Sequence, residues 1–406
     1  MITDSPHIYR KIGEQVYHER GEQTANPQSV ISAAIAQAQP LEAKGLAAVL
    51  TLNHLAYQTG ASYGFLRRIV ERNTDPYADL SIKRRNGRRM REISIPNSIL
   101  MEVQRWILHK VLAPLPTHHN SYAYTAGRSI LHCAQKHLGA KWIIKLDIRD
   151  FFPSINEAQA YAVFERAGYQ PLVSLEMARI CTRYAGHVNY LDPKRYRTAP
   201  EYTTIRVYRR PLLGFLPQGA PTSGALANLV ANALDVKLTD LASNHGLVYT
   251  RYADDLIFSS IDAFDREAAM NIVMAARKEL RSERFIMHEQ KTSILPPGAR
   301  KLVLGLLVDG DRVRMSRKLR SRIAYHIRGV ELFGLSAHMQ HIDFSSIDGV
   351  VRHVSGLLAF AHDIEPEWAN RAQLKWRTTL YQNGWIEIPI FPEKTYNGVR
   401  TAELSA

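Results

Sequence analysis

Two groups of aspartates stand beside short apolar runs, a placement that suits metal-dependent chemistry. Asp254 and Asp255 are adjacent within the run YTRYADDLIFSS, and Asp147 ends the apolar run WIIKLD. Carboxylates next to buried strands are costly to desolvate unless a cation neutralises them. Aspartate also favours turns, but both flanks here are apolar and no glycine stands at the tip. The sequence therefore indicates a divalent-cation site.

The chemistry of such a site depends on how the strands pair. If a strand at 142–147 pairs beside a hairpin at 247–260, Asp147 and Asp254 meet at one end of the sheet. Two hard metal ions about 3.5–4 Å apart, bridged by carboxylates, serve in-line phosphoryl transfer. We therefore expect Asp147, Asp254 and Asp255 to be catalytic metal ligands for two Mg²⁺ ions, with Mn²⁺ as an alternative ion.

Short strands and helices are predicted on either side of these aspartates. Apolar runs predict strands at 142–148, 247–251 and 256–260, and the Asn86-Gly87 dipeptide predicts a hairpin within 79–95. A second hairpin is expected at 302–315, and helices are expected over 98–112, 155–185, 222–244, 264–283 and from 316 to about 382. The motifs G-x-G-x-x-G and G-x-x-x-x-G-K-S/T do not occur. The pattern favours an α+β fold with an antiparallel sheet.

The composition favours a polyanionic partner. The chain has 52 Lys and Arg against 38 Asp and Glu, a net charge of +14, and 46% hydrophobic residues, enough for a sizeable core. An anionic membrane surface is the usual rival for such a charge. However, no uncharged apolar run reaches membrane-spanning length, and the N-terminus lacks an apolar signal core. The two cysteines offer neither a disulfide framework nor zinc-ligand spacing. We expect a cytoplasmic protein without membrane contact.

Four blocks in one order resemble the palm of a reverse transcriptase. They are LDIRDFFPSI, LPQGAPTS, YADD and HEQKT, and VLGL at 303–306 resembles the strand turn beneath the primer. Each block alone is a weak signal, but their shared order within about 60–380 is a strong one. The resemblance implies an α+β right-hand polymerase with fingers, a palm of antiparallel sheet and a helical thumb. It also implies RNA-directed DNA polymerase activity.

Individual roles follow from the resemblance. Phe152, five residues after Asp147, matches the residue that excludes a 2′-hydroxyl and so favours dNTPs over rNTPs. Gln218 and Gly219 match nucleotide-binding positions, with Gly219 letting backbone approach the nucleotide closely. Lys291 matches a lysine beside the leaving pyrophosphate, where it can act as a general acid.

Basic residues supply the remaining predicted contacts. Arg91, assisted by Lys83, resembles the fingers residues that bind the triphosphate. The helix expected from 316 resembles the thumb, and its basic face would follow template–primer phosphates. The predicted nucleic-acid-binding residues on that helix are Arg317, Lys318, Arg320 and Arg322.

The predicted organisation follows the same resemblance. It comprises an N-terminal extension at 1–45, fingers at 46–141, a palm at 142–310 in which 156–215 belongs partly to the fingers, a thumb at 311–382 and a C-terminal tail at 383–406.

Several runs are similar to retron and other bacterial defence-associated enzymes. They include QRWIL, SYAYTAGRSI and HCAQKH. Two positions depart from the pattern, since Leu304 stands in V-L-G where retrons have V-T-G, and Gly224 follows Ser223 where proline is common. The resemblance implies cDNA synthesis from a dedicated non-coding RNA in a retron-like antiphage system. Its partners would be that RNA, an RNA/DNA hybrid, dNTPs and an effector protein, and the oligomeric state stays open.

Three alternatives use the same residues. The first is untemplated or protein-primed DNA synthesis by a defence-associated reverse transcriptase outside the strict retrons. The second is a group II intron-type enzyme, although little chain follows residue 382 for extra DNA-binding segments. The third is a catalytically silent RNA-binding protein, against which the intact set of aspartates argues.

Overall fold

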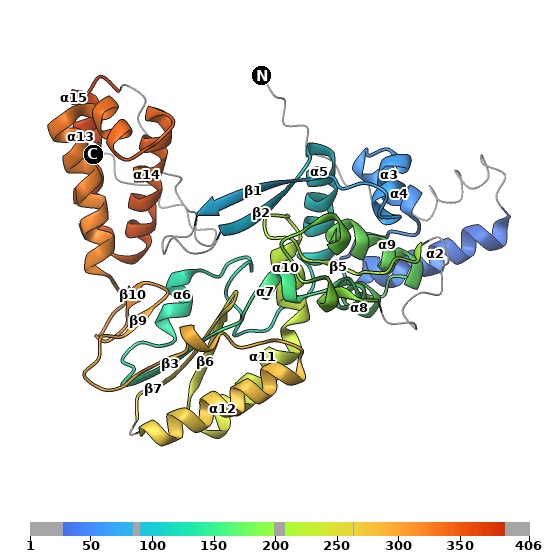
Figure 1. Ribbon diagram of the computed structural model, residues 1–406, viewed down its shortest axis with the longest axis horizontal. Helices are drawn as coiled ribbons and strands as arrows, with labels where there is room; N and C mark the ends of the chain where they lie inside the picture. Colours follow the sequence, from blue (N-terminus) through green and yellow to red (C-terminus); the bar gives the residue numbers. More distant parts are fainter. Residues whose placement is uncertain (1–26, 84–89, 199–207, 263, 386–406) are drawn as a thin grey trace, which may run out of the picture. The chain divides into compact units, whose positions relative to one another are not determined.

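The computed structural model describes residues 27–83, 90–198, 208–262 and 264–385 (Figure 1). The chain divides into two compact units. The first comprises 1–129, 144–258 and 264–294, and the second comprises 130–143, 259–263 and 295–406. The bounds of fingers, palm and thumb given above stay a proposal.

A four-stranded sheet carries the predicted aspartates. Its strands are β6 (Val248–Tyr252), β7 (Asp255–Ser260), β3 (Trp142–Asp147) and β8 (Ser293–Leu295), in the order β6-β7-β3-β8. The predicted pairing of strand 142–147 beside the 247–260 hairpin is therefore confirmed.

Two helices run along this sheet (Figure 1). Helix α11 (Asn232–Asn244) packs against β6, and α12 (Arg266–Ser282) packs against α11. Helix α12 confirms the predicted helix 264–283. Its amphipathic face buries Ala269, Ile272, Val273, Ala276 and Leu280 in the same hydrophobic core as Leu256 and Phe258 of β7. Burial of this apolar face stabilises the core shared by α12 and the strand that follows Asp254.

The predicted hairpin at 79–95 is confirmed. Strands β1 (Tyr77–Lys83) and β2 (Met90–Pro96) pair antiparallel, from Tyr77 opposite Pro96 to Lys83 opposite Met90. Its Asn86-Gly87 turn lies outside the described residues. The predicted helix 98–112 begins as α5 (Ser98–Ile107), whose N-terminus is capped by the Asn97 side chain. The helix then continues as a π-helix (Leu108–Leu112). Helices α2 (Gln28–Ala43), α3 (Leu52–Thr59) and α4 (Tyr63–Val70) precede the hairpin.

Two helices predicted as continuous are each divided. The helix expected at 155–185 is α8 (Glu157–Ala167) followed by α9 (Pro171–Cys181), because Gly168 ends α8 with φ 112° and Pro171 begins α9. The helix expected at 222–244 is α10 (Ser223–Val230) followed by α11, and the break falls at Ala231. Shorter elements are α6 (Ile130–Gln135), α7 (Phe151–Ser154), β4 (Arg183–Tyr184) and β5 (Gly214–Phe215).

The second unit contains a small sheet and a helical bundle. Strands β9 (Leu302–Val303), β10 (Leu306–Leu307) and β11 (Arg314–Met315) pair in the order β11-β10-β9, which confirms the hairpin expected at 302–315. Helices α13 (Arg317–His341), α14 (Ile347–Ile364) and α15 (Pro366–Gln382) pack on one another, as the helical region predicted. Trp376 is fully buried among them. No helix within the described ranges is long and apolar enough to cross a membrane.

Candidate active site

The ends of β3 and β7 bring two of the predicted aspartates to one cavity. The Ile148 amide, just beyond β3, donates to the Asp254 carbonyl at 2.9 Å, so the two strand ends are adjacent. Asp147 and Asp254 both line a cavity of about 780 Å³. Asp255 is not among the lining residues that the structure describes. Ala253, before Asp254, adopts a left-handed backbone with φ 56°, which turns the chain sharply between β6 and β7.

Asp147 is a buried carboxylate with only one of its oxygens satisfied. Lys291 Nζ lies 2.5 Å from Asp147 Oδ2. Asp147 Oδ1 is buried and has no hydrogen-bond partner among the described residues. The short 3-10 helix Glu289–Lys291 holds the lysine near, since the His288 amide just before it donates to the Asp147 carbonyl at 2.7 Å. An unsatisfied buried carboxylate oxygen at a cavity wall favours a cation.

The pKa of Asp255 also indicates that negative charges lie close together at this site. Although Asp255 is exposed at the start of β7, desolvation first, and then the charges of Asp254 and Asp147, raise the pKa of Asp255 to about 6. Lys291 and Lys145 oppose this rise. The carboxylates therefore repel one another, and an added cation would relieve that repulsion.

These residues fit a divalent metal. Asp147 Oδ1 has no partner within the described part of the chain, and the donors are hard carboxylate oxygens of the kind that Mg²⁺ prefers. In the part of the chain that the structure describes, no group of three or more His, Cys, Asp or Glu side chains could hold a metal by itself. Polymerase sites typically bind Mg²⁺ through one or two carboxylates together with substrate phosphates, so two converging aspartates satisfy that arrangement.

Phe152 and its neighbour Phe151 both line the same cavity, and Phe151 also belongs to the hydrophobic core. Phe151 is 4% exposed, and Phe152 is half-buried. Asp150, with φ 49°, turns the chain from β3 into α7 and so directs Phe152 to the cavity wall. The ring of Tyr124 meets Phe152 edge-on, with 5.9 Å between the ring centroids.

Gln218 and Gly219 join the cavity to the β1–β2 hairpin. Gln218 lines the cavity, and its carbonyl accepts from the Ser94 amide at 2.8 Å. Gly219 has φ 117°, and a Cβ there would lie 2.8 Å from the Ser94 carbonyl oxygen. The close approach that requires glycine is thus to strand β2, a role that the sequence had not indicated. Ser223 anchors the loop by donating to the Pro217 carbonyl at 2.7 Å.

The predicted triphosphate-binding residues lie on the hairpin, with their side chains outside the described atoms. Arg91 pairs with Ile82, and Lys83 pairs with Met90. Ile82 and Glu92 line the cavity from these two strands. The backbone therefore brings the hairpin to the cavity, and the role of Arg91 and Lys83 stays a prediction.

The predicted nucleic-acid-binding residues differ in their surroundings. Arg317 and Lys318 are exposed at the start of α13. Arg320 forms an ion pair with Glu365, and Arg322 approaches His353 Nε2 at 3.0 Å. Arg317 and Arg320 line a second cavity of about 370 Å³, together with Arg300 and Arg314.

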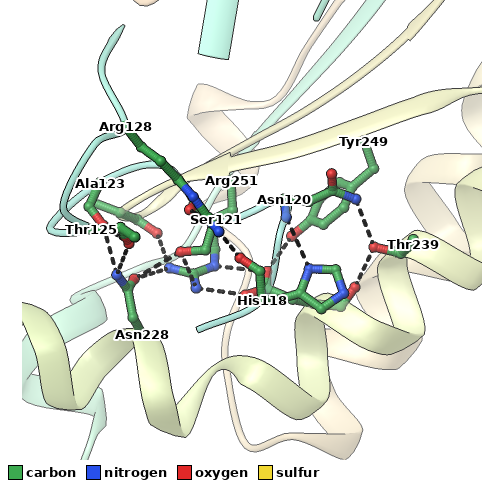
Figure 2. Close-up of polar contacts among 12 residues, drawn as sticks. His118, Asn120, Ser121, Ala123, Thr125, Arg128, Asn228, Thr239, Tyr249 and Arg251 are labelled. Atoms are coloured by element: carbon green, nitrogen blue, oxygen red, sulfur yellow. Dashed lines mark hydrogen bonds and ion pairs between the residues drawn. The ribbon is translucent and has the colours of Figure 1, made fainter. Parts of the chain in front are cut away.

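A buried polar network lies beneath the Asp254 turn (Figure 2). Arg251 and Asp235 are both fully buried and form an ion pair at 2.6 Å. The same guanidinium donates to Asn228 Oδ1 and Ser121 Oγ, each at 2.9 Å, and to the Ala253 carbonyl at 3.3 Å. Arg251 thus ties the turn before Asp254 to the rest of the first unit.

Sequence reasoning missed several residues that line the cavity, among them Tyr124, Arg149, Tyr190 and Arg195. Arg149 lies within LDIRDFFPSI, so its proximity to Asp147 was a usable signal. Tyr190 and Arg195 lie in a segment without periodicity, where no local pattern marks a cavity residue. Arg195 approaches Asp150 at 3.5 Å.

The fold and the cavity agree with a comparison against protein families. Residues 82–308, more than half of the chain, match the family model described as Reverse transcriptase (RNA-dependent DNA polymerase). The chain therefore belongs to the reverse transcriptase family. It has the right-hand polymerase fold, and it is an RNA-directed DNA polymerase that takes an RNA template and nucleotide substrates.

Curated relatives narrow the type. The chain is 29% identical to the retron Ec86 reverse transcriptase of Escherichia coli, over 73% of this chain and 83% of that protein. It is 32% identical to the retron Mx162 reverse transcriptase of Myxococcus xanthus, over 66% of this chain and 55% of that protein. The retron Mx65 reverse transcriptase of the same organism is 30% identical, over 80% of this chain and 71% of its own length. The chain is a bacterial reverse transcriptase of the retron type.

Proposed function

We propose that this enzyme makes cDNA from a dedicated non-coding RNA by two-metal nucleotidyl transfer. The observation that carries the chemistry is the cavity that Asp147 and Asp254 share, together with the buried Oδ1 of Asp147, which has no hydrogen-bond partner among the described residues. The similarity to three retron enzymes supports the dedicated template. A retron-like antiphage role, an effector protein as a further partner and action in the cytoplasm belong to the same proposal.

Each residue of the cavity has a proposed part. Asp147 and Asp254, with Asp255 beside them, would hold the ions. Bound Mg²⁺, or Mn²⁺ in its place, would lower the pKa of the attacking 3′-hydroxyl and neutralise the triphosphate. Lys291 lies 2.5 Å from Asp147 and can donate a proton to the leaving pyrophosphate.

The sugar and the base are proposed to meet the opposite wall. Phe152 presents a ring that leaves no room for a 2′-hydroxyl, and Gln218 donates or accepts a hydrogen bond near the incoming nucleotide. Arg91 and Lys83 bind the triphosphate from the hairpin. Arg317, Lys318, Arg320 and Arg322 contact template–primer phosphates without reading their sequence.

The test is to purify the protein from cells that carry its native locus and to sequence all bound RNA and DNA. The Asp254→Ala variant is purified in parallel, with Asp240→Ala, which changes an exposed aspartate of α11, as the matched control. We expect one discrete RNA in all three samples, and complementary DNA only in the wild type and the Asp240→Ala sample. DNA unrelated to any bound RNA would instead favour untemplated synthesis.

A further inference from the structure

Tyr124 occupies a wall of the active-site cavity without a role in the proposed chemistry. It lines the cavity together with Phe152 and Gln218, and it is 57% exposed. Its backbone is left-handed with φ 55°, a conformation that bulky residues rarely adopt. Such strain persists where surrounding contacts impose it, and it is common at functional sites.

Contacts with Phe152 and Gly224 help to set the position of the Tyr124 ring. The rings of Tyr124 and Phe152 form an edge-to-face pair with 5.9 Å between centroids and an interplanar angle of 65°. The Tyr124 ring also lies against Gly224 of α10, where an added Cβ would lie 2.6 Å from Tyr124 Cγ and 2.7 Å from Cδ1. Any larger residue at 224 would therefore displace the ring. This explains in physical terms why glycine follows Ser223 in this chain.

Hydrogen bonds clamp the residues on both sides of Tyr124 (Figure 2). Asn228 Nδ2 donates to the Ala123 carbonyl at 2.6 Å and approaches Thr125 Oγ1 at 3.4 Å. The Ser121 carbonyl, two residues before Ala123, accepts a hydrogen bond from Arg128 Nη1 at 2.5 Å. Asn228 is fully buried and also accepts from Arg251, so the clamp belongs to the network beneath Asp254.

We infer that Tyr124 is a positioning residue for sugar selection, which braces the Phe152 ring against the incoming nucleotide. The inference rests on the proposed role of Phe152. Contact with a neighbouring ring on one side disfavours rotation of the Phe152 ring away from the sugar, and so disfavours admission of a 2′-hydroxyl. Gly224 is part of this arrangement, because its lack of a side chain leaves the space that the Tyr124 ring fills.

The experiment measures kcat/KM for rNTP and dNTP incorporation by the full chain on an RNA template with a DNA primer. Edge-to-face ring pairs are modest interactions, so Tyr124→Ala and Gly224→Ala should each raise the rNTP-to-dNTP ratio roughly three- to tenfold. Tyr124→Phe is the matched control, since it keeps the ring, and its ratio should equal that of the wild type. Tyr124→Leu provides the same test if the alanine variant misfolds.

A double variant tells whether Tyr124 acts through Phe152. We expect Phe152→Ala to raise the ratio further than Tyr124→Ala, and the double variant to match Phe152→Ala alone. If Phe152→Ala raises the ratio while Tyr124→Ala and Gly224→Ala lower kcat/KM for rNTPs and dNTPs equally, the inference about Tyr124 fails and the proposed role of Phe152 in sugar selection is retained. If Phe152→Ala leaves the ratio unchanged, the proposed gate itself fails. An equal effect of Tyr124→Ala with and without Phe152 would mean direct nucleotide contact and would overturn the bracing role.

Discussion

The sharpest energetic prediction concerns Arg251, the centre of the network in Figure 2. Arg251→Met keeps most of the volume and removes the charge. Asp235 then loses the ion pair at 2.6 Å and a second bond at 2.8 Å from Arg251 Nε. It retains the hydroxyl of Tyr249 at 2.8 Å. Among the described residues, the variant therefore leaves the fully buried Asp235 carboxylate with one neutral side-chain donor, the Tyr249 hydroxyl.

The size of the effect follows from burial. Both partners are 0% exposed, and breaking a buried pair on one side typically costs about 3–5 kcal/mol because the remaining charge is uncompensated. Arg105 provides the matched control. It pairs with Glu102 at 2.6 Å, but both side chains are 55% exposed, so Arg105→Met should cost about 0–1 kcal/mol.

The assay is urea unfolding followed by tryptophan fluorescence, compared among the wild type, Arg251→Met and Arg105→Met. Adding Asp235→Leu to Arg251→Met removes the buried charge that has lost its partner. A double-mutant cycle that also includes Asp235→Leu alone should give a coupling free energy of about 1–3 kcal/mol between the two residues. Folded Arg251→Met should also synthesise less DNA, because the Ala253 carbonyl next to Asp254 loses its donor at 3.3 Å. Equal costs for Arg251→Met and Arg105→Met would refute the reasoning.

Three shorter predictions concern the cavity. Asp254→Ala should abolish DNA synthesis and leave RNA binding in a filter assay unchanged, since the basic surfaces are intact; equal loss of both would contradict that division. Phe152→Ala should raise rNTP incorporation relative to dNTP by roughly tenfold or more in single-nucleotide extension, and an unchanged ratio would remove the gate. Gly219→Ala should cost about 1–3 kcal/mol in urea unfolding, because its φ is 117° and its Cβ would meet Ser94. Gly356→Ala, with open space around it, is its control and should cost nothing.

The local elements of the fold were predictable from the sequence. The strands around Asp147 and Asp254, the β1–β2 hairpin and the helices after Met315 follow from apolar periodicity and turn dipeptides, which act over a few residues. The breaks at Gly168 and Ala231 were missed. The first had a visible signal in Gly168 and Pro171, whereas Ala231 carries none, since alanine is the residue best suited to continue a helix.

The candidate site was predictable in part. The motif order placed Asp147, Asp254, Phe152 and Gln218 in one site, and the structure brings all four to one cavity. The ion pair of Lys291 with Asp147 was not predictable from local pattern, because 144 residues separate the two. The close approach of Gly219 to Ser94 likewise depends on a strand more than a hundred residues earlier in the chain.

The class of protein and the carboxylates that define its chemistry were evident in the amino-acid sequence, because short runs carry them and their residue types and order are read directly. How each group is held depends on contacts that form only in the folded chain. The Tyr124 ring reaches Phe152 because the Tyr124 backbone is left-handed and because Gly224, beside the ring, has no side chain. Arg251 is buried because Asp235, on another element, neutralises it. Burial, ion pairing and ring packing join residues far apart in the chain, and local spacing does not encode them.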